Sequence, residues 1–292
     1  MKRLLPLLLL LAACSTPEPE TEPAATTAAP TGSDIHLFSL SGDGAQPIAR
    51  ITDRDGYDNQ PSFTSDGGMV LFTSDRTGNM DSWAYDVSDG SLTQLTDTPP
   101  GEYSPTVLPD EPSWFSVVRL DSTGLQTLWR HALSGDGEPA LVADIDRIGY
   151  FTWVGNDRVL FFRLGSPATL QLVTEGTGDT TVVATRVGRS LHRVPGQQAS
   201  SYIQVQEDDS REILRWDWNT GENSAIAVPL EGGQDYAWTP DGALVMAVEG
   251  ELYRYKPGES VDWSLVADLD LDGTSRLAVS PDGTLLAVVA NR

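Results

Sequence analysis

The sequence predicts an all-β fold, a six-bladed β-propeller, and three observations lead to this prediction. A pattern of short apolar strands recurs with a period near 43 residues. The strands are separated by turn residues, which the 27 glycines and 19 prolines supply in quantity. The chain also ends in the middle of a repeat, and its first folded residues contain the missing half. A fixed period of this length is typical of repeat architectures such as propellers.

Six segments share the same order of a short strand, a turn rich in Pro, Gly or Asp, and a second apolar strand. The residue before each turn marks its repeat, and these marker residues are Phe63, Val107, Trp153, Val194, Trp238 and Val279. Their mean spacing of 43.2 residues leaves room for two further strands, which the first repeat places at 82–87 and 91–96. Four short strands in about 40–45 residues are typical of one propeller blade.

The two ends of the folded region are expected to complete one blade together. The chain ends with a hairpin at 277–290 that turns at Pro281-Asp282-Gly283, and a lone hairpin is barely stable in water. Residues 35–40 and 47–52 are predicted to form two more strands. We therefore expect these N-terminal outer strands to pair with the C-terminal hairpin, which would close the ring and remove exposed sheet edges.

The N-terminus is predicted to carry an export signal and a tether. Residues 1–13 combine Lys2 and Arg3 with a short apolar run, which is typical of a signal peptide and too short to span a bilayer. Leu11-Ala12-Ala13-Cys14 resembles the bacterial lipobox, in which Cys14 would bear the lipid; an ordinary signal peptide with a chance cysteine is the alternative. Residues 14–33 are predicted to be the lipidated cysteine and a Pro/Thr/Ala/Glu tether, and residues 34–292 the propeller.

These features indicate an outer membrane lipoprotein, since by resemblance to Gram-negative lipoproteins Ser15 favours transport there. The sequence leaves open whether the domain faces the periplasm or the cell surface. The net charge of −23 would repel a phosphate backbone, so nucleic acid is excluded as a partner. We expect a monomer whose contact with the membrane is made only through the Cys14 lipid.

The repeat sequences resemble those of TolB-like, WD40-like β-propellers. The first repeat carries the best match, in Pro61, Ser65-Asp66-Gly67, Ser74-Asp75-Arg76, Gly78-Asn79, Asp81 and Leu95-Thr96. The second, third and fourth repeats match poorly. The resemblance implies the propeller fold and a cell-envelope scaffold that binds a protein or peptide, although such blades host unrelated functions.

The strongest candidate binding residues are Arg186, Arg189, His192 and Arg193. They cluster in a mostly acidic chain, at the link into the fourth repeat, where other links carry Asp or Glu. Such a cluster could contact an anion or a carboxylate on one face of the ring. The alternative is that these arginines neutralise neighbouring acidic loops.

A weaker candidate is a calcium site at Asp268, Asp270 and Asp272. The stretch "DLDLDG" matches the first half of an EF-hand loop, but the position that should hold a bidentate Glu is Val279. An acidic, solvated loop is the alternative. The aspartates Asp66, Asp241 and Asp282 are interpreted as hairpin-turn residues, because they recur at the same place in the repeat.

Support for catalysis is thin, so the chain is predicted not to be an enzyme and to need no cofactor, apart from the weak possibility of calcium. It has no Gly-x-Ser-x-Gly elbow, and its three histidines fall in different repeats without metal-binding spacing. The eight tryptophans are expected mainly to pack between blades. Because Trp, Tyr and Asp also suit sugars, a carbohydrate-binding or carbohydrate-active propeller is the alternative function.

Overall fold

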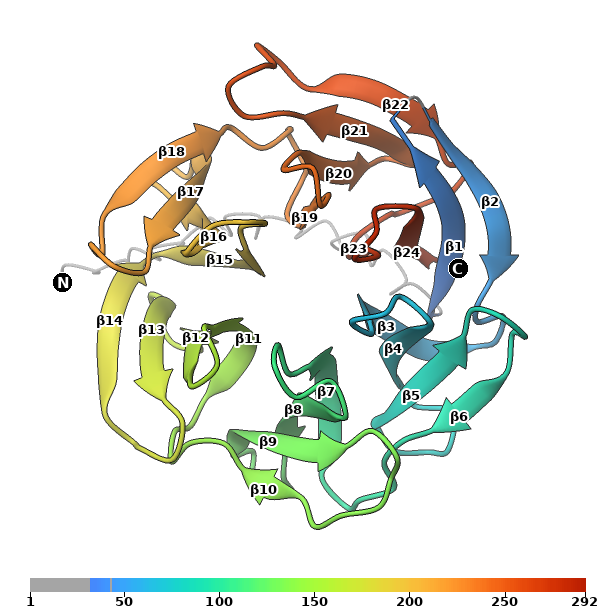
Figure 1. Ribbon diagram of the computed structural model, residues 1–292, viewed down its shortest axis with the longest axis vertical. Coiled ribbons are helices and arrows are strands. Elements are labelled where there is room, and N and C mark those ends of the chain that lie inside the picture. Colours follow the sequence, from blue (N-terminus) through green and yellow to red (C-terminus); the bar gives the residue numbers. More distant parts are fainter. Residues whose placement is uncertain (1–31, 43) are drawn as a thin grey trace, which may run out of the picture.

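The computed structural model describes residues 32–42 and 44–292, and all regular elements in these residues are strands. Cys14 and the rest of residues 1–31 lie outside the described part of the chain. Figure 1 shows the sheets arranged around a common centre, with the first strand of each repeat innermost. In the described ranges, no helix is long and apolar enough to cross a membrane.

Four of the sheets contain four antiparallel strands each, in sequence order from the centre outward. The first is β7 (Gly101–Val107), β8 (Trp114–Leu120), β9 (Gln126–Ala132) and β10 (Ala140–Leu141). The second is β11 (Ile148–Val154), β12 (Arg158–Arg163), β13 (Thr169–Thr174) and β14 (Thr180–Thr185). The third is β15 (Val187–Arg193), β16 (Ala199–Val205), β17 (Arg211–Asp217) and β18 (Asn223–Ala227). The fourth is β19 (Ala237–Trp238), β20 (Leu244–Val248), β21 (Glu251–Tyr255) and β22 (Ser264–Asp268).

The remaining eight strands form one sheet that joins the two ends of the described chain. It contains β1 (Gly32–Ser41), β2 (Gly44–Arg50), β3 (Gly56–Phe63), β4 (Met69–Ser74), β5 (Asp81–Asp86), β6 (Leu92–Gln94), β23 (Leu277–Val279) and β24 (Leu285–Asn291). A short parallel bridge, Gly32 to Gly56 and Ser33 to Tyr57, connects β1 to β3.

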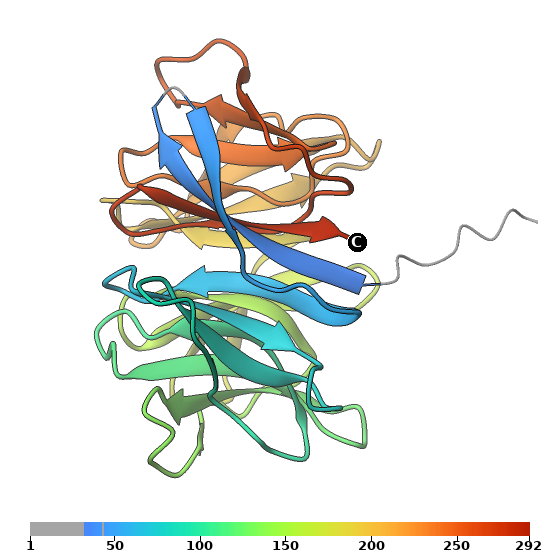
Figure 2. The same ribbon diagram turned by 90° about the vertical axis from the view of Figure 1, so that its right-hand side faces the viewer.

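The predicted pairing between the chain ends is present. Strand β1 runs antiparallel to β24 with Ile35 opposite Val289, and β2 pairs with the outer side of β1. Figure 2 shows β1 alongside β24, close to the C-terminus. Strand β1 begins at Gly32, ahead of the expected start at 35, and β2 ends at Arg50 rather than 52. The end of the chain is held in place by Arg292, whose guanidinium lies 2.8 Å from the Asp53 carboxylate.

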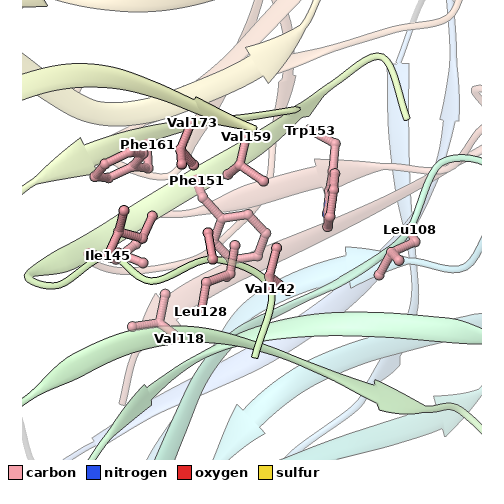
Figure 3. Close-up of a cluster of buried hydrophobic side chains, with 12 residues drawn as sticks. Leu108, Val118, Leu128, Val142, Ile145, Phe151, Trp153, Val159, Phe161 and Val173 are labelled. Carbon is pink, nitrogen blue, oxygen red and sulfur yellow. The ribbon is translucent and has the colours of Figure 1, made fainter. Parts of the chain in front are cut away.

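The core lies between neighbouring sheets, because the flat faces of the strands carry the apolar side chains. Figure 3 shows one such cluster, in which Phe151 and Trp153 of β11 pack with Val118 and Leu128 of the preceding sheet. The indole nitrogen of Trp153 donates a hydrogen bond to Ser116 Oγ at 3.0 Å, which satisfies its only polar atom. This agrees with the expectation that tryptophans pack between blades.

Candidate functional site

A pocket of about 120 Å³ lies where the innermost strands converge. Its lining includes residues from β3, β7, β11 and β15 and from the segments just before β19 and β23. Every repeat contributes at least two lining residues, and the polar ones include Gln60, Ser104, Tyr150, Arg189, Asp235 and Arg276. The pocket is therefore built by all the repeats together, and no single repeat could form it.

Irregular backbone turns two of these side chains toward the centre. Gln60 and Ser104 have positive φ angles of 60° and 55°, and the pairing register of β3 and β7 shifts at these points. A bulge of this kind re-aims a side chain that regular strand alternation would send elsewhere. Gln60 Oε1 then accepts hydrogen bonds from Ser104 N at 2.8 Å and from Thr73 Oγ1 at 3.0 Å, which ties the walls of adjacent repeats together.

An arginine–carboxylate pair forms one side of the pocket. Arg189 Nε donates to Asp235 Oδ1 at 3.1 Å and Nη2 donates to Oδ2 at 2.5 Å. This two-point geometry is the strong form of such a pair. The hydrogen bonds to Asp235 raise the pKa of the Arg189 guanidinium above its ordinary value.

A second arginine, Arg276, has only neutral hydrogen-bond partners in the described chain. Its Nη1 donates to Asn59 Oδ1 at 3.0 Å, and its Nη2 donates to the Tyr150 hydroxyl at 2.8 Å. The guanidinium also lies 5.2 Å from the centroid of the Tyr150 ring, within the range of a cation–π contact. These contacts hold the guanidinium in position without neutralising its charge.

His192 contributes no charge to the pocket near neutral pH. Burial lowers its pKa to about 4, since the charged form would lose its hydration. One ring nitrogen lies 3.0 Å from Ser190 Oγ, and the ring is 4.8 Å from that of Tyr236, centroid to centroid. His192 is therefore a neutral part of the wall.

The structure brings together only two of the four residues proposed from the basic cluster. Arg189 and His192 line the pocket, whereas Arg186 donates to the Gln206 carbonyl at 2.7 Å and pairs with Asp209 at 3.3 Å. Arg193 lies over the Trp218 ring, 5.3 Å from its centroid. Arg186 immediately precedes β15 and Arg193 is the last residue of this strand, and neither lines the pocket.

Sequence reasoning missed Tyr150, Asp235 and Arg276, although the repeat could have located them. All six repeats place a pocket-lining residue three positions before the marker residue of that repeat, and in five of them this residue is polar: Gln60, Ser104, Tyr150, Asp235 and Arg276. In the fourth repeat this position is Leu191, and Arg189 lies two residues earlier. The alignment of the repeats that locates the strands therefore also identifies which position of each strand faces the centre.

The proposed calcium ligands Asp268, Asp270 and Asp272 are all exposed. One carboxylate oxygen of Asp268 accepts the backbone N–H of Asp270 at 2.9 Å, which is a turn interaction within the loop. Across residues 32–42 and 44–292, no group of three or more His, Cys, Asp or Glu side chains is placed to hold a metal ion. The calcium site stays a prediction.

The turn aspartates behave as hairpin residues. Asp66 Oδ1 accepts from Thr64 Oγ1 at 2.6 Å and from Gly68 N at 3.0 Å. Asp282 repeats this arrangement with Ser280 Oγ and Thr284 N, at 2.6 and 3.0 Å. The hydrogen bonds lower the pKa of both carboxyl groups, because they favour the charged form. These aspartates are structural.

Comparison with known proteins identifies the fold. No family model matches the sequence, and no curated protein matches it. A TolB protein from Agrobacterium tumefaciens has a similar structure, with a TM-score of 0.68 at 14% identity, covering 89% of this chain and 98% of that chain. TolB from Acinetobacter baumannii has a TM-score of 0.57 at 13% identity, and the match covers 89% of this chain and 64% of that chain.

Enzymes are also among the similar structures. Oligogalacturonate lyase from Vibrio parahaemolyticus gives a TM-score of 0.55 at 15% identity, covering 90% of this chain and 98% of that chain. Gluconolactonases are similar as well. At these identities the likeness concerns the fold alone, and it shows a β-propeller fold similar to that of the TolB structures.

Proposed function

We propose that this chain is a six-bladed, lipid-anchored propeller of the cell envelope that acts as a scaffold and holds a segment of a protein or peptide at its central pocket. The blade count is supported by the spacing of the repeats and by the eight-stranded sheet, which divides into β23-β24-β1-β2 and β3-β4-β5-β6. With the four separate sheets, this division gives six groups of four strands.

The observation that carries the proposal is the polar pocket at the convergence of the repeats. It presents two arginines, an aspartate, two tyrosines and an amide within one small volume. A few placed polar groups in a concave site give orientation and specificity to a ligand. The resemblance to TolB, a periplasmic protein, supports the envelope location.

Site-specific photo-crosslinking in the native bacterium tests the scaffold function. A crosslinking amino acid at Thr106, which lines the pocket, should capture an envelope protein, whereas one at Leu125, an exposed turn residue, should not. The captured protein, once purified, should bind the wild-type chain and the control Val182→Trp, whose site is 56% exposed on β14, but not Thr106→Trp. Equal binding by all three would overturn the proposal.

The lipid anchor is tested separately by Cys14→Ser. Without the acylated cysteine, the protein should no longer fractionate with the outer membrane, because no other membrane contact is proposed. A bacterial lipoprotein carries several acyl chains, and stable anchoring needs more than one. A Cys14→Ser variant that remains in the outer membrane fraction would show that the lipobox interpretation is wrong.

A carbohydrate-directed function is the second candidate, and the similarity to oligogalacturonate lyase and gluconolactonase folds favours testing it. Glycan-array binding with and without calcium, together with assays of lyase and lactonase turnover, would detect it. Saturable binding of one sugar, or turnover that is lost in Thr106→Trp, would support this candidate over the peptide scaffold.

A further inference from the structure

The central pocket carries a net positive charge in a strongly acidic protein. Its charged lining residues are Arg189, Arg276 and Asp235, whereas His192 is neutral near pH 7. The Asp235 carboxylate is engaged by Arg189 at two points, so the charge of Arg276 is left over. The whole chain has a net charge of −23, so this local excess of positive charge is opposite in sign to the rest of the molecule.

Arg276 has N–H donors that its two side-chain hydrogen bonds do not use. A guanidinium has five N–H donors, and the hydrogen bonds to Asn59 and Tyr150 use two of its nitrogens. No carboxylate of the described residues lies within 4.0 Å of it, although twelve of the other arginines and one lysine in these residues have at least one such partner. An arginine fixed by neutral groups and facing a pocket is arranged to receive an anion from outside.

We propose that Arg276 binds a single carboxylate group carried by the peptide that the pocket receives. This inference rests on the proposed scaffold function and adds the chemistry of the ligand. The planar guanidinium matches a carboxylate in two-point geometry, and Tyr150 and Asn59 hold its plane in place. The carboxylate can belong to a chain terminus or to an Asp or Glu side chain.

Size and charge favour a peptide carboxylate over a polyuronate. The pocket of about 120 Å³ accommodates a small group, such as a carboxylate with its adjacent carbon atoms. The field of a protein with a net charge of −23 repels a ligand in proportion to the number of its negative charges. The protein repels only one negative charge in a ligand with a single carboxylate, whereas in a chain of uronates it repels a charge at every residue.

A peptide array tests the inference with the purified full-length protein in detergent. The probes are random heptapeptides in two matched sets, one with a free C-terminal carboxylate and one with a C-terminal amide, each set including members with and without Asp or Glu. Trigalacturonate is the sugar arm. We expect binding only by peptides that have a free terminal carboxylate or an acidic side chain, with no binding of trigalacturonate.

The variants Arg276→Gln and Arg276→Lys separate charge from geometry, and Arg158→Gln, at the start of β12 and outside the pocket, is the matched control. Arg276→Gln should weaken binding of the selected peptides by roughly 10- to 100-fold, since a charge-assisted hydrogen-bond pair is lost. Arg276→Lys should recover part of the loss, and Arg158→Gln should bind as the wild type does. Far-UV circular dichroism checks that each variant is folded.

The outcomes distinguish this inference from the scaffold proposal. Peptides without Asp or Glu that bind the wild type equally as acid and amide, or peptides of either set that bind Arg276→Gln unchanged, would overturn the carboxylate inference and leave the scaffold intact. If Arg276→Gln does not fold, the binding of the acid and amide peptide sets to the wild-type protein still tests the carboxylate inference. Binding of trigalacturonate without any peptide would overturn both.

Discussion

Leu37 of β1 lies directly opposite Ala287 of β24, so the first and the last described strands are neighbours in one sheet. Leu37 is fully buried and packs in a cluster with Phe72 of β4, in the strands that follow along the ring. The same side chain therefore connects the start of the chain, its end and the next repeat. Closure through such a contact should make the stability of the domain sensitive to it.

We predict that Leu37→Ala lowers the free energy of unfolding by about 2–5 kcal/mol, because it leaves a cavity in a close-packed cluster. Ile48→Ala, on the neighbouring strand β2, is the matched control. Because Ile48 is 52% exposed, this substitution should lower the free energy of unfolding by less than about 0.5 kcal/mol. Urea unfolding followed by tryptophan fluorescence measures both. Similar small losses in the two variants would mean that β1 is not needed to hold the chain ends together.

The sequence was sufficient to predict where the strands lie and how the ends pair. Alternating apolar residues and turn residues are local signals, and their recurrence at 43.2 residues made each weak signal stronger. The markers Val107 and Val194 fall in poorly matching repeats, yet their strands appear at the expected places. Strand ends were less accurate, as at Gly32, because strand pairing rather than local composition fixes them.

The pocket was harder to predict because its residues meet only through the ring. Arg186 and Arg193 are close to Arg189 in sequence, yet neither lines the pocket. Arg276 is far from Arg189 in sequence, yet both line the same cavity. Clustering along the chain therefore does not indicate which residues line one cavity, and the bulges that turn Gln60 and Ser104 inward leave no clear sequence signature.

Two buried carboxylates at equivalent repeat positions have different surroundings. Asp58 and Glu102 are 44 residues apart and both fully buried. Asp58 pairs with Arg54 at 3.1 Å and with Arg76 at 3.4 Å. Glu102 has Arg119 at 3.8 Å and the His131 ring nitrogen Nε2 at 3.4 Å, and it accepts from the Thr98 hydroxyl at 2.7 Å. Burial raises its pKa.

We predict opposite effects from neutralising these two groups. Asp58→Asn should lower the free energy of unfolding by about 3–5 kcal/mol at pH 7, because it leaves the half-buried guanidinium of Arg76 without a carboxylate partner. Glu102→Gln should be neutral or stabilising at pH 7, since it removes a poorly compensated buried charge.

The sign of the pH dependence provides a check on Glu102. The pKa of Glu102 in the folded protein lies above the ordinary value of 4.5. Its favourable contribution to the stability of the folded state is therefore fully present below pH 4.5 and is lost as the pH rises through the folded-state pKa. Any gain from Glu102→Gln in urea unfolding should therefore be largest at pH 7 and disappear near pH 4. A gain that is the same at both values would contradict the assignment.

The buried histidine His131 should make the protein less stable in mild acid. Burial lowers its pKa from 6.5 to about 4, with Arg119 acting in the same direction. The unfolded chain therefore binds a proton between pH 6.5 and pH 4 that the folded chain rejects, so stability falls as the pH falls through this window. Replacement by Gln should flatten the fall in the urea midpoint between pH 7 and pH 4.5. An unchanged slope in His131→Gln would show that the ring titrates normally.

The last prediction concerns the charge of the whole domain. With 42 acidic and 19 basic residues, exposed carboxylates without partners repel one another, and raising the salt concentration shortens the Debye length from about 10 Å at 0.1 M to 3 Å at 1 M. We expect the melting temperature to rise with sodium chloride, because exposed ion pairs, which salt weakens, contribute only about 0–1 kcal/mol each.

Charge reversal at single sites separates general repulsion from specific pairing. Glu138 and Glu231 are exposed and have no cation within 4.0 Å in the described residues, so Glu138→Lys and Glu231→Lys should raise the melting temperature at low salt. Asp53→Lys is the matched control. This substitution would break the contacts with Arg50 and Arg292 at the chain ends, so it should lower the melting temperature. The gain from the glutamate reversals should shrink in 1 M salt. A melting temperature that falls as salt is added would show that the ion pairs outweigh the repulsion, and the acidic surface would then not be what limits the stability of this domain.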